Sequence, residues 1–81
     1  MNNFPNRETV ERIRREYPAG TRIELLQMDD CFAPPIGTRG TVIAVDDAGS
    51  IMPRWDNGSS LSVAFEVDRV RKLTEEDESH D

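Results

Sequence analysis

Residues 36–58, IGTRGTVIAVDDAGSIMPRWDNG, decide the fold of this chain. Residues 41–45 are rich in β-branched side chains, and residues 51–55 return after the tight turn expected at residues 46–49. A second turn follows at residues 56–58, where Asp, Asn and Gly stand in succession. This pattern predicts a β-meander, which needs further strands to cover its apolar face in water.

Further strands are predicted on both sides of the meander. Ile23 and Leu25 alternate with polar neighbours, which is typical of a half-buried strand. The same alternation recurs at residues 61–65, and a last short strand is expected at residues 69–73. Pro53 lies inside a predicted strand although its nitrogen has no hydrogen to donate. That strand is therefore expected either to lie at an edge or to bulge at this point.

A short amphipathic helix is predicted at residues 6–16, ahead of the strands. Asn6 is a suitable N-cap, and Val10 and Ile13 fall on one apolar stripe. Pro18 biases the residue before it away from helical geometry and ends the element.

The chain is expected to divide into three parts. Residues 1–18 form the N-terminal helix and its lead-in, and residues 19–73 form the β domain. Residues 74–81, TEEDESHD, are too highly charged to pack, so this acidic segment is predicted to be disordered.

The formal net charge is −6, and residues 23–68, the middle of the predicted β domain, carry a net charge of the same size. Between residues 23 and 68, eight carboxylates stand against two cations, Arg39 and Arg54. Nucleic-acid affinity depends on neutralising phosphates with Lys and Arg, so this charge disfavours a nucleic-acid partner.

The alternative is a nucleic-acid-binding barrel that uses arginines on the side of the helix. On the helix itself, oppositely charged residues four positions apart largely neutralise one another. The arginines that this alternative would use are Arg7, Arg12, Arg14, Arg15 and Arg22.

No catalytic residue, metal site or cofactor is predicted. Cys31 is the only cysteine and His80 the only histidine, which excludes a disulfide and disfavours a nucleophilic triad. The aspartate pairs at residues 29–30 and 46–47 fit no metal-binding spacing and are typical of turns. A cryptic enzyme that uses acidic residues is a further alternative, and it would need an enclosed pocket to shift the pKa of one carboxyl group.

The sequence gives no sign of export or membrane insertion. The first residues, MNNFPNRET, lack the apolar core of a signal peptide, and the longest apolar run, at residues 42–45, is far too short to span a bilayer. A cytoplasmic protein with no membrane partner is expected.

The longest irregular segment, residues 29–39, is the predicted binding loop, because so long a connection in a small domain is more often functional than a simple joint. Trp55 either lines a groove beside this loop or closes the core next to the following turn, and we favour the core. The predicted partner-binding residues of the loop and the central hairpin are Asp29, Asp30, Phe32, Pro34, Pro35, Arg54, Trp55 and Asp56.

Four blocks of sequence are similar to one bacterial family, the domain of unknown function 4314 (DUF4314). The blocks are YPAGTRIELLQMDD at 17–30, PPIGTRGTV at 34–42, VDDAGSI at 45–51 and RWDNGSSL at 54–61. The similarity runs from Tyr17 to about Leu73 and leaves out the helix and the acidic segment. Pro53 departs from the family, which tends to carry a β-branched residue there, and residues 31–33 also differ from the usual filling of the loop.

The order of the predicted elements also resembles that of SH3-like barrels. The two resemblances imply a mainly β fold, a small five-stranded SH3-like barrel with one short N-terminal helix, and an association with bacteria, phages and mobile elements. They imply no reaction. The expected function is a non-enzymatic interaction module that binds a protein partner through the 29–39 loop and the central hairpin, and the acidity favours a partner with a basic surface.

Overall fold

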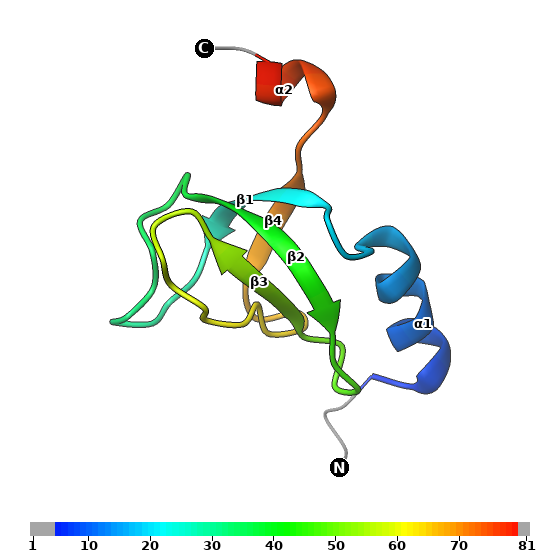
Figure 1. Cartoon of the computed structure of the whole chain (residues 1–81). Helices are drawn as coiled ribbons and strands as arrows, with labels where there is room; N and C mark the ends of the chain where they lie inside the picture. The colour runs from blue at the N-terminus through cyan, green and yellow to red at the C-terminus, as the bar shows by residue number, and fades with distance from the viewer. Residues whose placement is uncertain (1–4, 80–81) are drawn as a thin grey trace.

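One antiparallel sheet with the strand order β3-β2-β1-β4 organises residues 5–79, the part of the chain that the computed structural model describes. Figure 1 shows the N-terminal helix at the right of this sheet and a second short helix above it, next to the C-terminus. In chain order the elements are α1 (Arg7–Glu16), β1 (Arg22–Gln27), β2 (Arg39–Val45), β3 (Ile51–Trp55), β4 (Arg69–Lys72) and α2 (Glu75–Ser79).

The predicted central hairpin is confirmed, because β2 and β3 pair in antiparallel fashion across a tight turn. The side chain of Asp46 accepts hydrogen bonds from the backbone N–H groups of Ala48 at 3.0 Å and of Ser50 at 2.9 Å. Gly49 adopts a φ of 81°, a conformation that residues with a Cβ rarely adopt. Local turn chemistry therefore sets the position of the reversal.

The position of β3 at an edge of the sheet explains Pro53. The backbone N–H and C=O of Ile51 face away from β2 and pair with Val63 at 3.0 and 2.8 Å. Backbone groups alternate in direction along an antiparallel strand, so Pro53, two residues on, also faces away from β2 and needs no donor. The irregularity in pairing lies opposite, in β2 between Val42 and Ala44.

The prediction of five strands closed into a barrel is wrong. The strand expected at residues 61–65 is reduced to one bridge at Val63, and the sheet of the described residues has four strands and stays open. The backbone and indole N–H groups of Trp55 donate to the carbonyls of Ser59 at 3.0 Å and Leu61 at 2.9 Å. Within the expected strand, the carbonyl of Leu61 thus accepts from a side chain and not from a neighbouring strand. The coarser prediction, a small mainly β domain with an N-terminal helix, is confirmed.

The core lies on the inner face of the sheet, under α1 and the segment that follows β3. Ile23 and Leu25 of β1 are fully buried, and Val42 and Trp55 are each 1% exposed. Gly40 of β2 allows the ring of Trp55 to pack directly on the strand, because a Cβ at Gly40 would lie 2.8 Å from Cε3 of that ring. The sheet and its single tryptophan are thus fitted to each other at this point.

The N-terminal helix begins and ends where the sequence predicts. The side chain of Asn6 accepts a hydrogen bond from the backbone N–H of Thr9 at 2.8 Å, which makes Asn6 the N-cap. Val10 and Ile13 are buried, and the chain leaves the helix at Tyr17. Residues 1–4 of the predicted lead-in lie outside the described residues.

The acidic segment, for which the sequence predicts disorder, contains the helix α2 over residues 75–79. The hydroxyl of Thr74 accepts from the backbone N–H of Asp77 at 3.1 Å, and the carboxylate of Asp77 accepts from the backbone N–H of Thr74 at 2.9 Å. This reciprocal pair is a capping box, which satisfies two backbone donors at the start of α2. Residues 80–81 lie outside the described residues.

Candidate functional site

The long loop between β1 and β2 is fixed at its stem by backbone hydrogen bonds. The N–H of Leu25 donates to the carbonyl of Thr38 at 2.8 Å, and the carbonyl of Leu25 accepts from the N–H of Gly37 at 2.8 Å. The hydroxyl of Thr38 donates to the carbonyl of Pro35 at 2.6 Å. Pro34 is buried. These contacts and the two rigid prolines give residues 28–38 a defined conformation.

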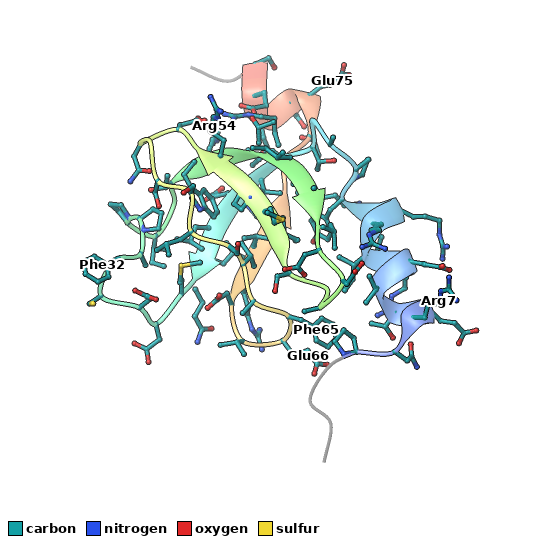
Figure 2. The ribbon with its side chains drawn as sticks, turned by 60° about the horizontal axis from the view of Figure 1, so that its bottom comes forward. Arg7, Phe32, Arg54, Phe65, Glu66 and Glu75 are labelled. Atoms are coloured by element: carbon teal, nitrogen blue, oxygen red, sulfur yellow. The ribbon has the colours of Figure 1, made fainter. Side chains whose placement is uncertain are left out.

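The tip of this loop presents an aromatic side chain to solvent. The backbone N–H groups of Phe32 and Ala33 donate to the carboxylate and the carbonyl of Asp30, at 2.8 and 3.0 Å respectively. The Phe32 side chain is 80% exposed, and Ile36 on the same loop is 62% exposed. Figure 2 shows Phe32 at the outer end of the loop, directed away from the sheet. Asp29 and Asp30 are exposed beside it, so the tip is apolar with an acidic border.

Two of the predicted partner-binding residues face the interior, which corrects their assignment. Trp55 is 1% exposed, and its indole N–H donates to the carbonyl of Leu61 at 2.9 Å. Its ring closes the core, which is the alternative that we favoured over a groove. Pro34 is also buried and supports the loop from within. Neither ring is presented to a partner.

Arg54 and Asp56 lie apart from the tip of the loop. Figure 2 places Arg54 on the side of the sheet that carries α2, away from Phe32. Arg22 of β1 holds Asp56 by two parallel hydrogen bonds, at 2.9 and 2.7 Å. These bonds keep the pKa of Asp56 below its usual range and raise the pKa of Arg22. The predicted residues therefore divide between two surfaces, of which the loop tip holds Asp29, Asp30, Phe32 and Pro35.

The second surface, which we call the arginine face, is the outer face of the sheet. Each of the four strands contributes one arginine to this face. Successive side chains of a strand point to opposite faces, and each arginine stands next to a residue that faces inward. The sheet register places Thr41 between Arg22 and Arg54, and Glu24 between Arg39 and Arg71. The residues that define the arginine face are Arg22 of β1, Arg39 of β2, Arg54 of β3 and Arg71 of β4.

Sequence reasoning missed the arginine face because it summed the charge between residues 23 and 68. That interval leaves out Arg22 and Arg71, which the sheet brings beside Arg39 and Arg54. The signal was present in the alternation of Arg22 with buried Ile23, which already predicts an outward direction for the arginine.

The acidic helix α2 lies over the arginine face. The carboxylate of Glu78 pairs with both Arg22 and Arg39, the latter at 3.2 Å. The guanidinium of Arg39 also donates to the backbone carbonyl of Asp77 at 3.2 Å. Arg71 pairs with Glu24 at 2.6 Å and with Asp77 at 3.4 Å. The hydrogen bonds from Thr74 lower the pKa of Asp77 from its usual 3.8.

The arginines proposed for the nucleic-acid alternative do not form one surface. Arg14 of α1 donates to the carbonyl of Val45 at 3.1 Å and pairs with Asp47 at 2.7 Å, which ties the helix to the central hairpin. Arg7 lies 3.7 Å from Glu11 within the helix. Arg22 belongs to the arginine face instead. Arg12 and Arg15 are exposed on α1.

Within residues 5–79, no three His, Cys, Asp or Glu side chains are grouped so that they could hold a metal ion. Cys31 is exposed on the long loop. No helix in the described part of the chain is long and apolar enough to cross a membrane.

Comparison with known proteins identifies a family but no activity. The model of the family described as "Domain of unknown function (DUF4314)" matches residues 6–73. The match takes in α1, which the resemblance noted above had left out, and stops before α2. Among curated proteins and among solved structures, no match to the chain was found.

Proposed function

Because the chain belongs to DUF4314, a family whose description names no activity, we propose its function from the geometry of the long loop. The protein is a non-enzymatic interaction module that binds a protein partner through the tip of the loop at residues 29–36. The observation that carries the proposal is a Phe32 side chain that is 80% exposed on a loop held at both ends.

An exposed phenylalanine on an ordered loop is a natural anchor for binding. Burying such a ring contributes about 1.5–3 kcal/mol, and aromatic anchors dominate the binding energy of many interfaces. The hydrogen bonds from Phe32 and Ala33 to Asp30 already fix the turn, so little conformational entropy is lost when a partner covers the ring.

The chemistry of the loop tip defines the kind of partner. Phe32 and Ile36 call for an apolar pocket, and the exposed carboxylates of Asp29 and Asp30 call for cations at its border. The net charge of −6 would steer such a basic surface toward the module at long range. Arg54, Trp55, Asp56 and Pro34 are left out of this binding surface.

We also propose that the open sheet is related to SH3-like barrels. The meander and the long loop between β1 and β2 support this relationship. The exposed thiol of Cys31 is compatible with the reducing cytoplasm, where we place the protein. Its origin in a phage or a mobile element stays a prediction from the family resemblance.

The experiment is capture of the partner from a bacterial lysate on the immobilised full chain. Phe32→Ala is compared with Val67→Ala, since Val67 is an apolar side chain that is 68% exposed elsewhere on the surface. We expect Phe32→Ala to lose the captured protein and Val67→Ala to retain it, with both variants unfolding at the same urea concentration as the unchanged chain. Equal recovery by the two variants would contradict the proposal.

A further inference from the structure

The arginine face is a strongly cationic surface. The helix α2 covers this surface and is held there only by charge. Four arginines, Arg22, Arg39, Arg54 and Arg71, stand on it against two carboxylates of the sheet and its turns, Glu24 and Asp56. The face is therefore cationic without α2, although the whole chain has a net charge of −6.

No apolar side chain of α2 helps to hold this helix on the sheet. No residue of α2 is buried, and its contacts with the sheet are the ion pairs and hydrogen bonds of Asp77 and Glu78. Half-exposed ion pairs of this kind contribute little each and are weakened by salt. A helix held in this way is readily displaced by a competitor of the same charge.

The family match includes the arginine face but not the helix α2 that covers it. The DUF4314 model ends at residue 73, one position before the capping residue Thr74. The four arginines lie within the matched region, whereas α2 lies beyond it.

We propose that the arginine face is a binding site for an acidic peptide segment of a partner protein, and that α2 occupies this site within the chain until the partner displaces it. Glu78 shows what the site accepts, because one carboxylate lies between two guanidinium groups of neighbouring strands. Arg54 extends the site across β3, and within the described residues it makes no ion pair. In Figure 2 it lies on the same side of the sheet as α2.

The arrangement of charges favours separate carboxylates over a continuous phosphate backbone. Glu24 stands between Arg39 and Arg71 in the sheet, and Asp56 stands against Arg22. A nucleic-acid strand laid across the face would place phosphates against both carboxylates, whereas the side chains of an acidic peptide can be spaced to avoid them. Nucleic-acid binding is therefore treated as an outcome that would overturn the proposal.

The test compares two charge-neutralising substitutions in α2 of the full chain. Glu78→Gln removes the carboxylate that contacts Arg22 and Arg39. Glu75→Gln removes the same charge from an exposed residue that points away from the sheet in Figure 2. The probe is a fluorescein-labelled synthetic peptide with the sequence TEEDESHD, titrated at low salt and followed by fluorescence anisotropy.

We expect Glu78→Gln to bind the peptide about fivefold more tightly than either Glu75→Gln or the unchanged chain. A further Arg39→Gln substitution should abolish the gain, and Phe32→Ala should leave it unchanged, which separates this site from the loop of the proposed function. Equal peptide binding by Glu78→Gln and Glu75→Gln would overturn the proposal. Tighter binding of Glu78→Gln to a labelled DNA duplex than to the peptide would overturn the assignment of the ligand.

Discussion

Arg22 at the start of β1 holds Asp56, in the turn after β3, through a planar pair of hydrogen bonds. Nη1 lies 2.9 Å from Oδ1 and Nη2 lies 2.7 Å from Oδ2. The same guanidinium donates to the hydroxyl of Thr41 in β2, at 3.0 Å. One side chain therefore links three neighbouring parts of the sheet, and it does so at the border of the arginine face.

Removing the charge of Asp56 tests what this link contributes to stability. Asp56→Asn loses the charge-assisted pair with Arg22, and because both side chains are partly exposed the expected loss in free energy of unfolding is only about 0.5–1 kcal/mol. Urea denaturation followed by tryptophan fluorescence measures it. Asp29→Asn makes the same change in charge on the loop and should stay within about 0.5 kcal/mol of the unchanged chain. A matching loss in both variants would contradict a specific role for the pair.

The same pair predicts how stability depends on pH. The pKa of Asp56 is lowered from the usual 3.8 in the folded chain, so the folded state binds fewer protons than the unfolded state in this range. Its contribution is complete above the unfolded pKa and disappears as the pH falls through the folded pKa. The difference in stability between the unchanged chain and Asp56→Asn should be constant from about pH 5 to 7 and shrink below about pH 4. A difference that grows on acidification would contradict this assignment.

The contact of Gly40 with Trp55 predicts a large effect from a small substitution. In Gly40→Ala the new Cβ would lie 2.8 Å from the ring of Trp55 and 2.9 Å from the backbone carbonyl of Arg54, so β2 and β3 must move apart. We expect a loss of about 1–3 kcal/mol in free energy of unfolding. Ser62→Ala, on the exposed segment after β3, serves as the control and should be neutral. Unchanged stability in Gly40→Ala would mean that the ring does not pack on β2.

The capping box of α2 can be tested by removing its hydroxyl. Thr74→Ala leaves the backbone N–H of Asp77 without its acceptor, at a cost of about 1 kcal/mol to the helix. Amide hydrogen exchange in residues 75–79 should become faster, and salt should accelerate it further because the ion pairs to Arg22 and Arg39 are partly exposed. Glu76→Gln is the matched control in the same helix. Exchange that is fast in the unchanged chain and insensitive to Thr74→Ala would show that α2 is not formed.

The elements that depend on local chemistry were predictable from the sequence. The turn at Asp46 and Gly49, the N-cap at Asn6 and the alternation around Ile23 are each determined by residues within a few positions of one another. Pro53 predicted either an edge strand or a bulge, and β3 lies at the edge of the sheet, where a residue without a backbone donor needs no ladder bond.

The elements that depend on distant partners were not predictable in the same way. The strand expected around Val63 is reduced to one bridge with Ile51, and the carbonyl of Leu61 beside it accepts from the indole of Trp55. The acidic composition of residues 74–81 predicted disorder, although Thr74 and Asp77 stand at the spacing of a capping box. Their cationic partners come from strands that are far away in the sequence.

In the candidate site too, features set by neighbouring residues were predictable and features set by distant residues were not. The length of the loop and its prolines singled out a segment that the structure shows to carry an exposed Phe32 at its tip. Whether Trp55 lay in a groove or in the core depended on how the segment after β3 folds back, which no local pattern specifies. The predicted set therefore mixed surface residues with core residues.

The central claim is that the loop holds Phe32 out in solvent in one ordered conformation. Backbone ¹⁵N relaxation of the full chain measures this order directly, without knowledge of the partner. Order parameters at residues 30–36 should be close to about 0.85, the value typical of a rigid backbone such as that of β1 and β2. Values below about 0.6 in the loop, with the strands still rigid, would contradict the claim.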